Sequence, residues 1–219
     1  MHDALGIADV LINRATALRL SGRLTDAQAS CQEALALLAD APSGAALTKS
    51  KAEACRTIGI CLVQTGKLDL GTEELRRSLA LYEQAKDTFG MANLHSDLGT
   101  ALRMVGNMTA SDMHFERAVT LWNSLGASAS LANTLNNIGL GYHLRGAFNK
   151  ALEVYERALT IAQETAMWRV QAIVLTGMGD VYRDLGQFDQ AFSAYNEARP
   201  IAERASEAWL VSYILDALG

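Results

Sequence analysis

Residues 135–158 read LNNIGLGYHLRGAFNKALEVYERA, and residues 175–198 read LTGMGDVYRDLGQFDQAFSAYNEA. The two stretches begin forty residues apart and share glycine, tyrosine and alanine at the same positions. The same period extends along the chain as pairs of glycines, and Gly219 again follows Gly179 by forty residues. The pairs are Gly59 and Gly66, Gly99 and Gly106, Gly139 and Gly146, and Gly179 and Gly186. This self-similarity predicts a repeat protein, because units that cannot bury their apolar faces alone must stack on their neighbours.

Each repeat predicts two amphipathic helices separated by a glycine. Leu135, Ile138 and Tyr142 fall on one helical stripe, since spacings of three and four place side chains on one face. The second glycine of each pair is expected to end the first helix in the left-handed conformation. Three residues later comes a residue of helix N-cap type, which predicts that the second helix begins there. These residues are Thr25, Asp69, Thr109, Asn149 and Asp189.

Composition excludes several classes of protein. Half of the 219 residues are hydrophobic, only 6% are aromatic and only two are proline, which disfavours a β-sandwich or propeller. The net charge of −5 disfavours direct binding of nucleic acid by this segment. There is no apolar run of membrane-spanning length and no signal-peptide layout, and the three cysteines form no disulfide framework. A cytoplasmic location without membrane contact is the default expectation.

The repeated pattern L-x2-[IM]-G-x2-Y, G, A-x3-Y-x2-A resembles the tetratricopeptide repeat. The residues that carry this resemblance are Gly59, Gly66, Gly99, Gly106, Gly139, Tyr142, Gly146, Ala151, Tyr155, Ala158, Gly179, Tyr182, Gly186, Ala191, Tyr195 and Ala198. The match is strongest near the C-terminus and decays toward the N-terminus. A period of forty, where about 34 is common, is similar to the long-helix variant found in spindle-orientation adaptors and in the sensor domains of large bacterial regulators of the maltose-activator type.

The resemblance implies an all-α fold: a right-handed α-solenoid of about five two-helix repeats plus a final single helix, in one domain over residues 1–219. We expect the repeats at 8–47, 48–91, 92–131, 132–171 and 172–207, with a partial sixth at 208–219. The first repeat is four residues longer, and the segment 41–46 is expected to hold the extra loop. Pro200 is expected to kink its helix or to end it early. Residues 208–219 are apolar on most sides, which favours an excised piece of a longer protein over a capping helix.

The sequence carries none of the common catalytic motifs, so we predict a non-enzyme without cofactor or metal. His95 is expected to be a partly buried packing residue. In related repeats the first helices line the inner, concave surface, and positions forty residues apart form columns on it. The candidate groove residues are Arg19, Asn93, Ser96, Arg103, Asn133, Asn136, Asn137, His143, Thr176, Asp180 and Arg183.

Two interpretations of these columns stay open. Arg19, Arg103, His143 and Arg183 form a partly basic column that could hold an acidic peptide, because arginine pairs well with carboxylate. Alternatively, Asp180 and Asp184 neutralise Arg183 locally. The asparagines could pair with a peptide backbone. Trp122, Trp168 and Trp209 are either plugs between repeats or rim anchors for a partner.

The leading functional hypothesis is a non-enzymatic protein-interaction or effector-sensing module, as a fragment of a larger bacterial transcriptional or signalling regulator. A free-standing adaptor that bridges two proteins is the alternative, and a peptide-regulated response-regulator phosphatase is a third. The expected partner is a protein or peptide, acidic in the basic-column hypothesis, or a small effector. A homodimer through the C-terminal helix is also expected, since an apolar solenoid end is an available interface.

Overall fold

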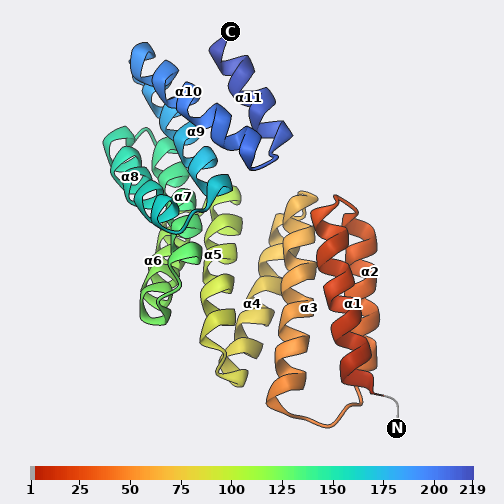
Figure 1. The fold of residues 1–219 in the computed structure, drawn as a ribbon. Coiled ribbons are helices and arrows are strands. Elements are labelled where there is room, and N and C mark those ends of the chain that lie inside the picture. Colours follow the sequence, from red (N-terminus) through yellow and green to blue (C-terminus); the bar gives the residue numbers. More distant parts are fainter. Residues whose placement is uncertain (1–2) are drawn as a thin grey trace. The chain divides into compact units, whose positions relative to one another are not determined.

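The computed structural model describes residues 3–219, which form eleven α-helices and no strand (Figure 1). This confirms the predicted all-α solenoid of two-helix repeats. In chain order the helices are α1 (Ala4–Leu20), α2 (Leu24–Leu37), α3 (Ala45–Gln64), α4 (Leu68–Ala85), α5 (Thr88–Met104), α6 (Met108–Leu125), α7 (Ser128–Leu144), α8 (Phe148–Glu164), α9 (Trp168–Asp184), α10 (Phe188–Arg204) and α11 (Ala208–Leu218).

The helices pair as α1 with α2, α3 with α4, and so on, with α11 as the first helix of a sixth repeat. The predicted boundaries at 48, 92, 132 and 172 fall inside α3, α5, α7 and α9, a few residues after each helix begins. The chain forms two compact units, and the single domain stays a prediction. The N-terminal unit extends to Leu121, and the C-terminal unit comprises Trp122–Gly219.

Glycine ends the first helix of each pair as predicted. Gly22, Gly66, Gly106, Gly146 and Gly186 have φ between +72° and +86°. At Gly66 the turn closes with two hydrogen bonds: the Gly66 N–H donates to the Val63 carbonyl, and the Lys67 N–H donates to the Leu62 carbonyl. This is the Schellman arrangement, in which a left-handed residue satisfies the last carbonyls of a helix.

The predicted N-caps are wrong by two residues. Thr25, Asp69, Asn149 and Asp189 lie within the first turn, and the N-cap residues are Arg23, Lys67, Ala147 and Gln187, none of which makes a side-chain capping hydrogen bond. The Schellman turn fixes the next helix to begin directly after the residue that follows its glycine. Asp69 and Asp189 instead favour the helix through their negative charge near its N-terminus.

A second left-handed position recurs between successive repeats. Lys86, Gly126, Ala166 and Ser206 have φ of +53°, +63°, +52° and +58° and lie forty residues apart. Only Gly126 has the residue type that this conformation prefers, so the other three turns carry backbone strain. The sequence pattern did not reveal this turn, because three different side chains occupy it.

Pro200 does not end its helix, since α10 continues from Phe188 to Arg204. Pro200 is exposed to solvent, so water can hydrate the carbonyl that loses its backbone donor. The extra loop of the first repeat lies between α2 and α3, and α3 begins at Ala45, so the last two residues of the predicted loop are helical.

Glycine faces an aromatic ring inside three successive helix pairs. A Cβ atom at Gly139 would lie 2.6 Å from the ring of Tyr155, and one at Gly179 would lie 2.6 Å from the ring of Tyr195. The equivalent contact between Gly99 and Phe115 is 2.8 Å. The ring occupies the space that a side chain would take, which allows the two helices of a pair to approach closely.

Candidate functional site

The first helices of neighbouring repeats contact one another within each unit and form what we call the first-helix surface. It comprises α1, α3 and α5 in the N-terminal unit and α7, α9 and α11 in the C-terminal unit. Ion pairs join successive first helices in both units. Lys49 pairs with Asp87 over 2.6 Å in the N-terminal unit, and Arg169 pairs with Glu207 in the C-terminal unit. These two pairs occupy equivalent positions of the repeat, which indicates a recurring way of holding neighbouring repeats together.

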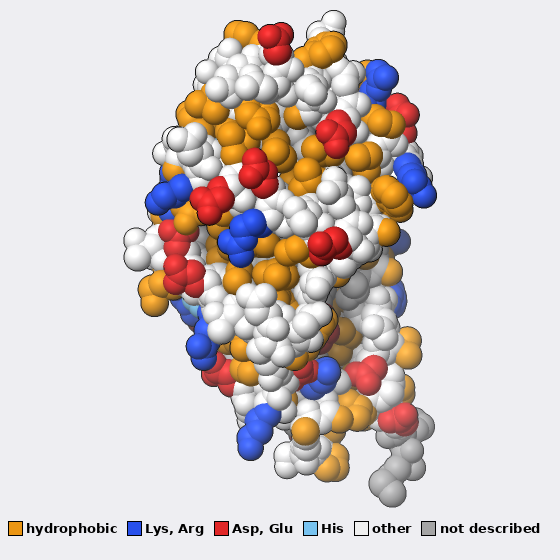
Figure 2. All heavy atoms as spheres, turned by 60° about the vertical axis from the view of Figure 1, so that its left-hand side comes forward, with side chains coloured by type: hydrophobic (Ala, Val, Ile, Leu, Met, Phe, Trp, Pro, Cys, Tyr) orange, Lys and Arg blue, Asp and Glu red, His pale blue; other side chains and the backbone are white. Residues whose placement is uncertain are grey.

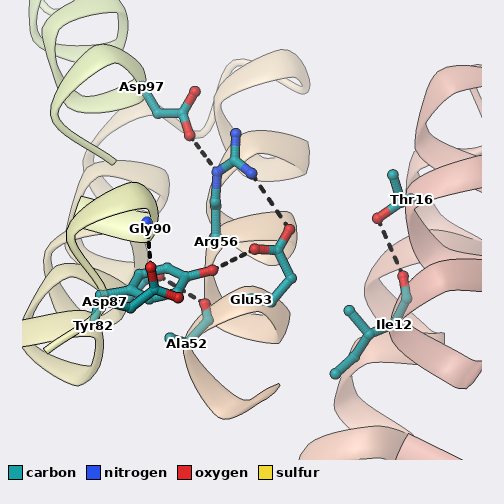
Figure 3. A network of polar contacts seen from close by, with 10 residues as sticks. Ile12, Thr16, Ala52, Glu53, Arg56, Tyr82, Asp87, Gly90 and Asp97 are labelled. Carbon is teal, nitrogen blue, oxygen red and sulfur yellow. Dashed lines mark hydrogen bonds and ion pairs between the residues drawn. The ribbon is translucent and has the colours of Figure 1, made fainter. Parts of the chain in front are cut away.

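In the N-terminal unit a polar network lies between α3, α4 and α5 (Figure 3). The Nε–H of Arg56 donates to Asp97 over 2.6 Å, its Nη1 lies 3.4 Å from Glu53, and the hydroxyl of Tyr82 donates to Glu53. Burial of the guanidinium disfavours its charge, but the carboxylates of Asp97 and Glu53 outweigh this and raise the pKa of Arg56. Burial, with Glu53 nearby, raises the pKa of Tyr82. The network is satisfied by its own members.

A polar pocket of about 450 Å³ opens between α1 and α3 in the same unit. The hydroxyl of Ser50 donates to Asp9 across this pocket over 2.6 Å. The residues that line it are Asp9, Ile12, Asn13, Ala46, Lys49, Ser50 and Glu53. Ser50, Lys49 and Glu53 already have partners within the unit, so little of the lining is available to a ligand.

In the C-terminal unit α7, α9 and α11 together form a smaller and more apolar pocket of about 180 Å³. We call it the inner pocket. Its lining comprises Asn136, Leu140, Tyr155, Ile173, Thr176, Gly177, Asp180, Trp209, Leu210 and Tyr213. The hydroxyl of Thr176 donates to the Ala172 carbonyl. In contrast, the half-buried amide of Asn136 has no hydrogen-bond partner among residues 3–219.

Asp180 organises one wall of the inner pocket. Its Oδ1 accepts hydrogen bonds from the hydroxyls of Tyr195 (2.7 Å) and Tyr213 (2.8 Å), and Nη1 of Arg183 lies 3.1 Å away. Burial and the hydrogen bond to Asp180 raise the pKa of both tyrosines, so both stay protonated as donors. The bond from Tyr213 ties α11 to α9, which fixes the position of the third wall.

The cations of the predicted basic column have partners in the C-terminal unit. His143 Nε2 lies 2.8 Å from Asp184, and Arg183 lies 3.1 Å from Asp180 and 3.5 Å from Asp184. The hydrogen bond with His143 lowers the pKa of Asp184, against a small opposing effect of burial. His143 and Arg183 are therefore already paired with carboxylates of the chain itself. Less positive charge is available at this surface to bind an acidic ligand.

The structure brings three of the predicted groove residues together in the inner pocket: Asn136, Thr176 and Asp180. Asn133, Asn137 and His143 lie on α7 outside its lining, and Arg183 lines a different pocket beside α10. Arg19, Asn93, Ser96 and Arg103 belong to the N-terminal unit and line none of its pockets described above. That Arg19 and Arg103 bind an acidic peptide stays a prediction.

The predicted groove residues did not include Tyr213, and Trp209 was considered only as a plug or a rim anchor, yet both line the inner pocket. Tyr213 follows Asn133 by eighty residues, so extending the asparagine column by two repeats would have found it. Of the other tryptophans, Trp122 is buried and donates to Thr134 over 3.1 Å, as a plug would. Trp168 stacks with the guanidinium of Arg204, whose central carbon lies 3.7 Å from the ring centre.

Two histidines that are distant in sequence meet between α5 and α6. The Nδ1 atoms of His95 and His114 lie 2.9 Å apart, and both side chains are half-buried. Burial, together with His114 and Arg117, lowers the pKa of His95 to about 4. Burial and Arg76 lower the pKa of His114. One neutral ring donates from Nδ1 and the other accepts at Nδ1, so a proton on the accepting nitrogen breaks the hydrogen bond.

We therefore expect acid to destabilise the chain through this pair. The folded-state pKa of His95 is below its ordinary value of 6.5, so its contribution is complete above pH 6.5 and is lost as the pH falls toward 4. Urea denaturation at pH 7.5 and pH 5 measures the difference, and a His95→Gln variant should lose less stability between the two. An equal loss in both proteins would show that the pair does not govern acid sensitivity.

Potential metal ligands, membrane-spanning helices and cysteines were the other features to consider in the described part of the chain. Residues 3–219 contain no cluster of three or more potential metal ligands. None of their helices has the length and apolarity needed to cross a membrane. Cys31 and Cys55 are buried, and burial raises the pKa of their thiols to about 12 and about 11. They are therefore unreactive thiols at neutral pH.

The fold and the recurring turns define an α-solenoid of helix pairs. Residues 90–164 and 172–198 match family models described as tetratricopeptide repeat, so these two segments consist of tetratricopeptide repeats. No curated protein matches the sequence.

Several solved structures share the fold. BtubC from P. vanneervenii is similar over 94% of this chain and 84% of its own, with a TM-score of 0.78 and 18% identity. A signal-transduction ATPase with a tetratricopeptide-repeat sensor from Pyrococcus horikoshii matches 95% of this chain but only 31% of its own length (TM-score 0.79, 13% identity). The Rap conjugation regulator of plasmid pLS20, in complex with the Phr peptide, matches 91% of this chain and 54% of its own (TM-score 0.75, 15% identity).

Proposed function

We propose that the chain is a protein-interaction module whose inner pocket binds a peptide segment of a partner. One observation carries the proposal: the half-buried amide of Asn136 has no partner within residues 3–219, beside the apolar side chains of Leu140, Ile173 and Leu210. Because the donor and acceptor atoms of this amide have no protein partner within the described residues, they are available to a ligand that enters the pocket. An amide can donate to and accept from a peptide backbone, while an apolar side chain of the peptide enters the pocket.

The size of the pocket favours a peptide over a small effector. Pockets for small molecules typically measure about 300–1,000 Å³, whereas the inner pocket measures about 180 Å³. It can take one side chain of an extended chain more readily than a whole effector. Because His143 and Arg183 are already paired with carboxylates, we propose an uncharged, apolar side chain at this position rather than the acidic one of the basic-column hypothesis.

Two structural neighbours support a regulatory role. The Rap regulator was solved in complex with a peptide, and the repeats of the Pyrococcus ATPase are described as its sensor. By analogy of fold, we propose that the chain serves as the repeat module of a larger bacterial regulator. A free-standing adaptor would use the same pocket, but would act without attached effector domains. Neither role assigns a reaction to the chain.

Selection of a random peptide library displayed on phage tests peptide binding. We expect enriched peptides whose affinity falls about fivefold in an Asn136→Ala variant, since one hydrogen bond contributes about 1 kcal/mol. The matched control is Asn196→Ala, which removes an amide from α10 that bonds its own helix. Equal loss in both variants, or no enriched peptide, would contradict the proposal.

A further inference from the structure

Positive and negative side chains are scattered among hydrophobic ones on the face of the molecule shown in Figure 2. The described side chains of this face form no extended patch of one charge, so charge alone does not mark a ligand site there. An ion site in this chain therefore depends on a few side chains that converge on one point. The pair of His95 on α5 and His114 on α6 is such an arrangement.

The packing of the repeat does not require histidine at these two positions. Forty residues later the equivalent pair is Leu135 with Val154, and eighty residues later it is Leu175 with Ala194. Leu135 and Leu175 are 2% and 3% exposed, so apolar side chains fill this space between the two helices of a pair. Two imidazoles place polar atoms where these two repeats have none, which costs free energy unless the atoms are satisfied.

Two contacts beside the histidine pair hold α5 against α6. The buried hydroxyl of Ser111 donates to the Gly99 carbonyl over 2.7 Å. A Cβ atom at Gly99 would lie only 2.8 Å from the ring of Phe115, the residue that follows His114. Gly99 itself lies about one helical turn after His95. The backbone positions of both histidines are therefore fixed by nearby contacts, as a rigid set of ligands requires.

The separation of the two ring nitrogens matches that of two ligands on one metal ion. The Nδ1 atoms lie 2.9 Å apart. Imidazole nitrogens bind transition metals at about 2.0–2.1 Å, so two that meet at a right angle on the ion lie about 2.9 Å apart, as in square-planar and octahedral sites. A tetrahedral ion such as Zn²⁺ needs about 3.3 Å between them. The observed distance favours a square-planar or octahedral ion.

Both rings are in the protonation state that a metal ion needs. Burial lowers the pKa of both histidines, so both are neutral at neutral pH and each has one lone pair. Binding at both Nδ1 atoms replaces their mutual hydrogen bond: each ring turns its lone pair toward the ion, and the donor ring moves its proton to Nε2 through solvent. Both side chains are half-buried, so water reaches the rings.

We propose that His95 and His114 form a two-histidine site for Cu²⁺ or Ni²⁺ that clamps the two helices of the third repeat. Imidazole suits both ions, and both take the geometry that fits the distance. Water supplies the other ligands, because residues 3–219 bring no third histidine, cysteine or carboxylate to the pair. This proposal differs from the sequence expectation of a chain without metal. It concerns the N-terminal unit and is independent of peptide binding at the inner pocket.

Calorimetric titration of the chain with Cu²⁺ and with Ni²⁺, after purification without a histidine tag, tests the site. All proteins carry His2→Gln, because His2 is a further histidine, outside the described residues. We expect one equivalent bound per chain, with Cu²⁺ tighter than Ni²⁺. His95→Gln and His114→Gln should each weaken binding by at least about tenfold, since even the loss of an outer partner of a ligand costs about that much. The matched control is His143→Gln, which removes a histidine paired with Asp184 and should leave binding unchanged.

Charge substitutions separate this site from cation binding elsewhere on the surface. The guanidinium groups of Arg117 and Arg76 lie near the histidine pair and oppose a bound cation. Arg117→Gln should therefore tighten the binding of Ni²⁺. Arg157→Gln is the matched control, because Arg157 is an exposed arginine at the same position of the next repeat, where no histidine pair is present. It should leave the affinity unchanged.

Thermal unfolding tests whether the ion holds the two helices together. Ni²⁺ should raise the melting temperature of the parent and of His143→Gln, but not that of His95→Gln or His114→Gln, because a ligand of the folded state stabilises it by mass action. Circular dichroism establishes that each variant is helical. Unchanged affinity in both His95→Gln and His114→Gln would overturn the proposal. Tighter binding of Zn²⁺ than of Cu²⁺ would overturn the geometry on which it depends.

Discussion

Replacing Gly139 with leucine is expected to lower the free energy of unfolding by about 3 kcal/mol or more, at the upper end of what overpacking costs. Even a Cβ atom at this position would lie 2.6 Å from two ring carbons of Tyr155. Tyr155 is 2% exposed and cannot move without separating α7 from α8. Thermal unfolding should show a fall of the melting temperature of roughly 6–12 °C for a chain of this size.

The matched control for this substitution is Ala129→Leu. Ala129 is an exposed residue of the same helix, so the added leucine meets solvent rather than a ring. Its effect should stay within about 0.5 kcal/mol, as for most surface changes. Equal melting temperatures for Gly139→Leu and the unaltered chain would show that the glycine does not lie at the closest approach of the two helices.

Replacing Arg56 with leucine should lower the free energy of unfolding by about 3 kcal/mol, because it leaves carboxylates without their cation in a partly buried site. The side chains of Arg56 and Asp97 are only 22% and 23% exposed, and the bond between them joins α3 to α5. Chemical denaturation measures the loss. Arg77→Leu is the matched control: Arg77 pairs with Glu74 within one helix, is 61% exposed, and should cost well under about 1 kcal/mol.

A double-mutant cycle isolates the pair itself. Adding Asp97→Leu to Arg56→Leu removes the unpaired carboxylate, so the double variant should be more stable than Arg56→Leu alone. The remaining carboxylate, Glu53, still accepts the hydroxyl of Tyr82. Additive losses in the cycle would mean that Arg56 and Asp97 act independently and that their contact does not join the two helices.

Structural features were predicted correctly from the sequence where a residue type favours a single backbone conformation, as glycine does at the end of a helix. The left-handed glycines that end the first helices follow from the forty-residue pattern. The N-caps were misplaced because the Schellman turn, rather than the nearest cap-type side chain, decides where the next helix begins. Pro200 does not end α10 early, because the cost of proline in a helix depends on solvent exposure, which periodicity does not report.

The candidate site was predicted less well, because contacts between repeats depend on side-chain pairing. The column argument placed Asn136, Thr176 and Asp180 on one surface, and the structure brings them into one pocket. The same argument counted His143 and Arg183 as available cations, although Asp184 lies within 3.5 Å of both. The pairing of His95 with His114 joins residues nineteen apart, a separation that no motif marks.

The left-handed residue between repeats has an evolutionary consequence. Because Lys86, Gly126, Ala166 and Ser206 hold the same backbone conformation at intervals of forty, each repeat from the second onward connects to the next through the same turn. Duplication or loss of a forty-residue block bounded by these turns therefore rejoins identical backbone geometry. Gene rearrangements that preserve this block length can lengthen or shorten the array without requiring a new type of turn. Insertions or deletions of other lengths would move the glycines away from the aromatic rings that they face.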